Sequence, residues 1–171
     1  HPFLANFDGD KITVTKDILE GEPFESPMMP FGGNEQLAWS PNGEQLAYTC
    51  RKKVGRDYAT STDSDIFLYD IATGTTRNLC KPEGWTAPTS TDYTRSLQQQ
   101  AVNQSKVDAN VGYDINPQFS PDGKYVAWSS MERDGYESDR ARLCVYDLKS
   151  GKKSYVTESF DSGVDGFAWA S

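Results

Sequence analysis

The chain has 171 residues, with 17 Lys and Arg against 25 Asp and Glu, so its formal net charge is −8 at pH 7. This acidic balance excludes the basic footprint that nucleic-acid binding requires, and it disfavours an anionic membrane surface. No apolar run approaches the length of a membrane-spanning helix. We therefore expect neither nucleic acid nor a membrane as a partner.

Residues 1–30 are interpreted as the end of a structural repeat that precedes the two complete ones described below. Alternating β-branched residues over 11–15 predict a strand. Glu20-Gly21 resembles glycine turns that recur later in the chain, so a short outer strand is expected to run to about Ser26.

Residues 31–80 are predicted to form one complete repeat of four short strands. The first strand ends at Trp39-Ser40-Pro41-Asn42-Gly43. Proline suits a strand end because it cannot donate a ladder hydrogen bond, and Asn-Gly accepts the left-handed backbone that closes a turn. The other strands are expected at residues 45–51, 65–70 and 76–80, with a polar loop over 52–64.

Residues 81–113 are interpreted as an insertion between repeats, with a short helix around 94–101. A connection of this length in a compact domain is usually functional or mobile. Trp85 lies in this insertion and is expected to be the most exposed of the four tryptophans.

Residues 114–160 repeat the same landmarks in the same order. Phe119-Ser120-Pro121-Asp122-Gly123 matches the first turn, and strands are expected at residues 124–130, 142–147 and 153–157. Residues 164–169 match the first strand of a further repeat, which would occupy 161–171. Trp39, Trp128 and Trp169 fall at strand positions and are predicted to lie in the core.

The ordered repeat predicts an all-β fold, a partial β-propeller made of four-stranded antiparallel blades of the TolB or WD type. A β-sandwich would also contain short strands and regular turns, but it gives no reason for landmarks to recur in order. Closed propellers have about four to eight blades. We therefore expect the chain to be a fragment of a larger protein, opening inside one blade and ending inside another.

The sequence does not contain a recognisable metal or cofactor motif. Cys50, Cys80 and Cys144 have no metal-type spacing and are expected to be buried free thiols, with a disulfide left open as an alternative. The acidic residues near Gly9, near Ser64 and in 131–140 are candidates for a calcium site. None of these matches the twelve-residue calcium loop, so no cofactor and no metal are expected.

Three segments carry a resemblance to a known family: residues 111–117, the Phe119-to-Gly123 turn, and residues 127–140 with their Ser-Met-Glu-Arg-Asp-Gly-Tyr-Glu-Ser-Asp run. They resemble the propeller of bacterial dipeptidyl peptidases in the prolyl oligopeptidase family, in the dipeptidyl-peptidase 5 and acylaminoacyl-peptidase branch. TolB-type propellers share the Ser-Pro-Asp-Gly turn, so the longer run is the more specific signal.

The resemblance implies a periplasmic or secreted protein in which a propeller caps a C-terminal α/β-hydrolase domain with a Ser-Asp-His triad. The present chain has no Gly-x-Ser-x-Gly sequence, and its single histidine is His1. A triad needs a held histidine as general base. We therefore expect no catalytic residue here, and hydrolysis would belong to the parent protein.

The acidic run between the second and third strands of the second repeat contains the candidate substrate-binding residues, which are Glu132, Arg133, Asp134, Tyr136 and Glu137. A carboxylate can hold the free α-amine of a peptide through a charge-assisted hydrogen bond, and Glu132 and Glu137 are the first candidates. The alternative is a solvated loop with internal salt bridges of little energetic consequence.

The favoured hypothesis is the non-catalytic propeller portion of a secreted serine dipeptidyl or acylaminoacyl peptidase, which gates and orients peptide substrates. A TolB-like propeller that binds other proteins is the alternative, and a carbohydrate- or ligand-binding propeller is a third. A homodimer is also expected, through residues 11–26 and 164–169, unless these two segments pair with each other within one chain.

Overall fold

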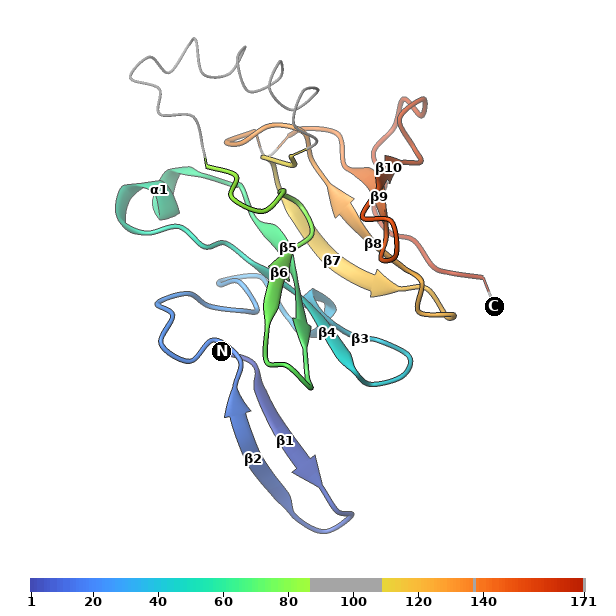
Figure 1. The fold of residues 1–171 in the computed structure, drawn as a ribbon. Helices are drawn as coiled ribbons and strands as arrows, with labels where there is room; N and C mark the ends of the chain where they lie inside the picture. The colour runs from blue at the N-terminus through green and yellow to red at the C-terminus, as the bar shows by residue number, and fades with distance from the viewer. Residues whose placement is uncertain (87–108, 137, 171) are drawn as a thin grey trace.

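The computed structural model describes residues 1–86, 109–136 and 138–170 (Figure 1). Two four-stranded antiparallel sheets follow one another along the chain, each ordered as its strands occur in sequence. The first contains β3 (Leu37–Trp39), β4 (Gln45–Cys50), β5 (Asp65–Asp70) and β6 (Thr76–Asn78). The second contains β7 (Asp114–Phe119), β8 (Tyr125–Ser130), β9 (Arg142–Asp147) and β10 (Lys153–Tyr155).

The two sheets have the arrangement of neighbouring propeller blades. Each is a simple meander, and the pairings are equivalent, since Ala47 lies opposite Leu68 in the first blade and Ala127 opposite Val145 in the second. The inner strand β7 of the second blade packs against β3, β4 and β5 of the first. The prediction of an all-β partial propeller is confirmed.

The duplicated turn has the same hydrogen bonds in both copies. Ser40 Oγ accepts from Gln45 N at 2.9 Å and donates to Asn42 Oδ1 at 2.7 Å. Ser120 Oγ likewise accepts from Tyr125 N at 3.0 Å and donates to Asp122 Oδ1 at 2.7 Å. The glycine that closes each turn has φ near +70°, a conformation that glycine adopts without steric cost. The Ser-Pro-Asx-Gly sequence is therefore sufficient to build the turn from its own side chains.

The main core lies where the two blades meet. It contains buried side chains from both sheets: Ala47, Ile66, Leu68, Leu79, Cys80, Val126, Trp128, Cys144 and Tyr146. The three cysteines are free and buried, as expected. Strands covered on both faces by neighbouring blades explain why the apolar runs are nearly continuous.

The predicted core positions of the tryptophans are only partly correct. Trp128 is fully buried, but Trp39 is 53% exposed because it ends β3, an edge strand of the first blade. Trp169 is half-buried and stacks on Tyr125, with ring centroids 6.4 Å apart. Trp85 is half-buried rather than exposed, with Lys81 Nζ 5.2 Å from its ring centroid.

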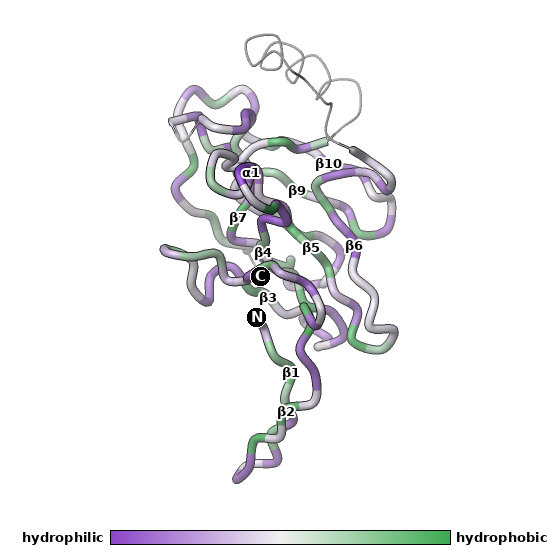
Figure 2. The backbone as a smooth tube through the Cα atoms, turned by 90° about the vertical axis from the view of Figure 1, so that its left-hand side faces the viewer, coloured by the Kyte–Doolittle hydropathy of each residue, from purple (hydrophilic) through white to green (hydrophobic). Residues whose placement is uncertain are grey.

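The N-terminal segment differs from the prediction. It forms a hairpin of β1 (Phe3–Phe7) and β2 (Ile12–Asp17), and residues 20–26 contain turns and bends in place of the expected outer strand. The hairpin turns at Gly9, where Asp8 Oδ1 accepts from the backbone N of Asp10 and Lys11. Pro23 lacks the N–H that a strand over 20–26 would need. The β1–β2 hairpin stands apart from the two blades (Figures 1 and 2).

Two other segments differ from the sequence-based expectation. Residues 164–169 do not form the predicted strand, because they make isolated hydrogen bonds to the second blade in place of a strand ladder. Val164 N donates to Ala141 O at 3.0 Å, and Gln118 Nε2 donates to Phe167 O at 3.5 Å. The polar loop over 52–64 contains the short helix α1 (Gly55–Thr60), and the 3-10 helix η1 (Asn34–Gln36) precedes β3. The helix expected at 94–101 lies outside the described residues. Among the described residues, no helix is long and apolar enough to cross a membrane.

Candidate functional site

Three connections lie at the same end of the blades and form the candidate site. They are the β4–β5 connection with α1, the β8–β9 connection with the acidic run, and residues 26–36 before β3 (Figure 1). In an antiparallel meander, successive connections alternate between the two ends of the sheet, so the loop after each second strand emerges where the chain enters the first. We call this end the loop face.

Asp134 joins the acidic run to the first blade. Its Oδ1 accepts from Ser61 Oγ and Thr62 N, each at 2.7 Å, and from Asp63 N at 3.1 Å. Gly135 N donates to Thr62 Oγ1 at 2.8 Å. Asp134 Oδ1 thus forms an interblade clamp, and the expected substrate contact of this residue stays a prediction.

The other candidate residues differ in how strongly their side chains are held by neighbouring groups. Arg133 forms an ion pair with Asp139, and its guanidinium lies 4.2 Å from the ring centroid of Tyr136. Glu132 is 52% exposed and lies 3.9 Å from Arg142 Nη1. Glu137 lies outside the described residues. Of the described candidates, Glu132 therefore has the carboxylate with the weakest contacts.

A pocket of about 350 Å³ opens beside the clamp. It is lined by residues from four segments: Met28, Met29, Pro30, Phe31, Gly32, Arg51, Thr62, Tyr113 and Met131. The chain has three methionines, and all three are in this lining. The sequence analysis missed this pocket. The Met-Met-Pro-Phe-Gly-Gly run before the first strand was the available signal.

Residues 28–32 form one wall of the pocket, and the Gln36 side chain holds this wall in place. The Gln36 side chain is buried, and its Oε1 accepts from Met28 N at 2.7 Å. Gly32 N donates to Met28 O at 2.7 Å. A Cβ at Gly32 would overlap Met28 O and the Gln36 amide, so glycine is required for this close approach. The pocket wall is therefore shaped before any ligand arrives.

Arg51 provides the polar part of the pocket lining. Its Nη1 donates to Ser61 O at 2.8 Å, and its guanidinium lies 4.5 Å from the ring centroid of Tyr58 on α1. Its Nε is buried and has no hydrogen-bond partner among the described residues. A buried donor without a partner costs free energy, and because this nitrogen is closed to solvent it is not a contact point for a ligand in the pocket.

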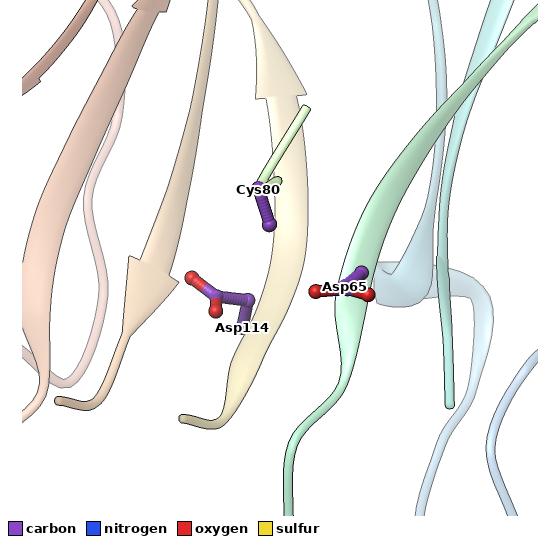
Figure 3. Close-up of side chains that lie close together, drawn as sticks. All are labelled: Asp65, Cys80 and Asp114. Atoms are coloured by element: carbon purple, nitrogen blue, oxygen red, sulfur yellow. The ribbon is translucent and has the colours of Figure 1, made fainter. Parts of the chain in front are cut away.

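A second polar cluster lies deep between the blades. Asp65 on β5, Asp114 on β7 and Cys80 after β6 place their ligand-type atoms within 4.8 Å of one another (Figure 3). Asp65 Oδ1 lies 2.5 Å from Lys81 Nζ, and Asp65 Oδ2 accepts from Asn78 Nδ2 at 2.9 Å. Both oxygens of this carboxylate are therefore occupied.

The cluster does not fit a metal ion. Burial raises the pKa of the Cys80 thiol well above its ordinary value, whereas a metal requires the thiolate. Burial also raises the pKa of Asp114 to about 7, although Asn110 donates to its Oδ1 at 2.8 Å. Lys81 Nζ already neutralises the Asp65 carboxylate, so the cluster is a polar link between the blades.

The calcium alternatives near Gly9 and Ser64 have other partners. Asp8 Oδ1 is committed to its own turn. Asp63 lies 2.8 Å from Lys81 Nζ and 2.9 Å from Lys53 Nζ. These carboxylates neutralise lysines or close a turn, and neither group converges on an open centre.

The chain is similar over nearly its whole length to dipeptidyl-peptidase 5 proteins. It is 45% identical over 170 residues to the Porphyromonas gingivalis protein, which corresponds to 99% of this chain and 21% of that relative. The Porphyromonas endodontalis protein is 44% identical over 143 residues, covering 84% of this chain and 17% of the relative. The Aspergillus fumigatus protein is 31% identical over 166 residues, covering 96% of this chain and 20% of the relative.

No protein-family model matches the chain. Among solved structures, TolB from Acinetobacter baumannii is similar over 95% of this chain and 27% of its own, with a TM-score of 0.47 at 19% identity. The tricorn protease is similar over 67% of this chain and 7% of its own, with a TM-score of 0.39 at 22% identity. The chain spans about one fifth of the length of the curated relatives it matches. At 45% identity over 99% of its residues, with two consecutive propeller blades, it is homologous to a segment of the dipeptidyl-peptidase 5 proteins.

Proposed function

We propose that this chain is the part of a dipeptidyl-peptidase propeller that receives and orients peptide substrates, without taking part in the chemistry. The observation that carries the proposal is the exposed Glu132 carboxylate, on the loop face of a chain homologous to dipeptidyl-peptidase 5. The name dipeptidyl-peptidase 5 describes the removal of dipeptides by those relatives, a reaction that must recognise a free α-amine.

The chemistry requires groups that these 171 residues do not contain. There is no Gly-x-Ser-x-Gly sequence, and His1, the single histidine, is paired with Asp17 through Nδ1 at 2.6 Å. We propose that an α/β-hydrolase domain in the rest of the parent protein supplies the nucleophile. Homologues of this class suggest an extracytoplasmic protein, and we propose a periplasmic or secreted location.

Glu132 suits the capture of an amine because its carboxylate is only weakly engaged. Arg142, its neighbour at 3.9 Å, is already 3.3 Å from Glu158 and lies against the Tyr155 ring. A peptide ammonium can therefore approach Glu132 without breaking a short ion pair. Because the Glu132 side chain is 52% exposed, water screens the pair, and an ion pair of this kind contributes about 0.5–1 kcal/mol, which corresponds to roughly two- to fivefold in affinity.

The test is calorimetric titration of the chain with a peptide amide that carries a free α-amine, and with its N-acetylated form. The free-amine peptide should bind about two- to fivefold more tightly, and Glu132→Gln should remove the difference. Glu44→Gln, at the opposite end of the first blade, is the matched control and should preserve it. Equal affinity of the unmodified chain for both peptides would refute the proposal.

A protein-binding role is the second candidate, and the β1–β2 hairpin favours it. Four large apolar side chains on this hairpin are more than half exposed: Phe3, Phe7, Ile12 and Val14. An isolated two-stranded hairpin is marginally stable in water, so contact with a second copy of the chain would stabilise it. Light scattering over a dilution series tests this homodimer, and a monomer at every concentration would exclude it.

A further inference from the structure

The two copies of the blade turn differ in one pair of polar side chains. In the first copy, Asn42 Nδ2 donates to Glu44 Oε2 at 2.7 Å. In the second copy, Lys124 Nζ lies 3.0 Å from Asp122 Oδ2. Each turn therefore matches its Asn or Asp to the side chain two positions later, an amide donor to a carboxylate in the first and a carboxylate to an ammonium in the second. An aspartate at position 42 would lack such a match, because it would face the Glu44 carboxylate.

The chain contains one Asn-Gly sequence, and it is Asn42-Gly43 in this turn. Asparagine is a thermolabile residue, and glycine has no Cβ that would keep its backbone nitrogen away from the side chain of the preceding residue. Asn42 and Gly43 are both exposed, and a Cβ added at Gly43 would meet nothing within 4 Å. Water and hydroxide can therefore reach this peptide unit.

We propose that Asn42 is a site of spontaneous deamidation, at which the closed turn slows the reaction and Glu44 makes the product destabilising. The Gly43 nitrogen gives its proton to hydroxide and forms a bond to Cγ of Asn42. The Cγ–Nδ2 bond breaks, and the nitrogen leaves as ammonia with a proton from water. Water then opens the succinimide ring that has formed. Opening at Cγ gives aspartate, opening at the backbone carbonyl gives isoaspartate, and no atom is oxidised or reduced.

The closed turn holds both reacting groups in place. Gly43 N donates to Ser40 O at 2.9 Å, so its proton is engaged inside the turn. Asn42 Oδ1 accepts from Ser40 Oγ at 2.7 Å and from Glu44 N at 3.2 Å, which fixes the carboxamide from its other end. Attack on Cγ requires the carboxamide to rotate and the turn to open. The folded chain should therefore react about tenfold more slowly than the unfolded chain, the factor for one or two net hydrogen bonds.

The product would disturb the contact between the blades as well as the turn. The two blade turns lie side by side at the end opposite the loop face, where Pro41 Cδ is 3.6 Å from the place that a Cβ on Gly123 would take (Figure 1). Aspartate at position 42 cannot donate to Glu44, and two carboxylates at this distance repel each other. Isoaspartate would in addition lengthen the main chain next to Pro41.

The first test incubates the chain at mildly alkaline pH, folded in buffer and unfolded in guanidinium chloride, and follows each asparagine by peptide mapping with mass spectrometry. Asn42 should convert to aspartate and isoaspartate in both samples, about tenfold more slowly in the folded one. Asn34 is exposed and precedes Glu35, so it is the internal control and should stay unchanged. An Asn42 that persists in the unfolded chain would overturn the site, and equal rates in the two samples would overturn protection by the turn.

The second test examines the product through variants. Asn42→Asp should lower the urea midpoint of unfolding, and adding Glu44→Lys should restore it, because the pair then copies Asp122 and Lys124 of the second turn. Asn6→Asp makes the same change of charge at another exposed asparagine and should leave the midpoint unchanged. A midpoint that Asn42→Asp does not move, or that Glu44→Lys does not restore, would overturn the role assigned to Glu44.

Discussion

Replacing Asp134 tests whether the acidic run serves the fold or the substrate. Asp134→Ala removes the acceptor of three short hydrogen bonds, from Ser61 Oγ, Thr62 N and Asp63 N, and of a 3.5 Å contact from Thr62 Oγ1. Asp63 N retains Ser61 Oγ at 3.1 Å, so the loss falls mainly on the other two donors. Hydrogen bonds to a charged group contribute about 1.5–3 kcal/mol each, but these share one oxygen and are only part-buried. We expect the free energy of unfolding to fall by about 2–3 kcal/mol.

Urea denaturation, followed by the intrinsic fluorescence of the four tryptophans, measures this change. Asp134→Asn should cost less than half as much, because the amide oxygen still accepts the same hydrogen bonds. Asp161→Ala, at an exposed aspartate, is the control and should change stability by less than about 0.5 kcal/mol. A loss as small as this for Asp134→Ala would refute the clamp. If Asp134→Asn abolished discrimination between free and acetylated peptides, Asp134 would belong to the substrate site after all.

Three further changes probe the interface between the blades. Trp128→Ala should destabilise the chain by about 3–5 kcal/mol, because the indole is buried and its Nε1 donates to Asp114 at 2.5 Å. Trp85 is only half-buried, so Trp85→Ala should cost far less. Similar urea midpoints for the two variants would contradict this. Burial raises the pKa of Asp114 from 3.8 to about 7, so the folded chain binds this proton more tightly than the unfolded chain does. The free energy of unfolding therefore falls as the pH rises from about 4 to about 7. Asp114→Asn should therefore gain stability relative to the unmodified chain from about pH 4 to pH 7, and parallel pH–stability curves would exclude this linkage. Gly112→Ala should prevent normal packing of the β8–β9 connection, since the added Cβ would overlap Met131 O, and unchanged thermal stability would show that the backbone can shift.

The blade turns were predictable because their hydrogen bonds are local. Ser40 and Ser120 each bond to groups within five residues, so the pattern Ser-Pro-Asx-Gly carries the whole structure of the turn. The strands that follow are continuous apolar runs, and their repetition in order was enough to predict a propeller. The exposure of Trp39 could not be predicted in this way, because burial of a strand end depends on what packs beside the edge of the sheet.

The wrongly placed outer strand has a comparable cause. The hairpin turn at Gly9 and the turn after β5 each contain an aspartate whose Oδ1 accepts hydrogen bonds from backbone N–H groups. This aspartate is Asp8 in the first turn and Asp70 in the second. The turn before Gly21 has the same arrangement, because Asp17 stands four residues before Gly21 as Asp70 stands before Gly74, and Asp17 Oδ1 accepts from Leu19 N at 2.9 Å. The predicted turn is therefore present, and what is missing is the strand after it, where Pro23 has no N–H to donate.

The sequence by itself determined the repeat, the four-stranded blades and the absence of a triad, because each depends on residue identity and short spacing. The candidate site depended on the tertiary structure. The clamp joins Asp134 to three residues that lie 71–73 positions earlier in the chain, Ser61, Thr62 and Asp63. The pocket draws its lining from four segments. Contacts of this range form only when neighbouring blades bring their loops to one end. That packing made Asp134 Oδ1 an acceptor for the first blade, left the Glu132 side chain 52% exposed, and brought the three methionines together.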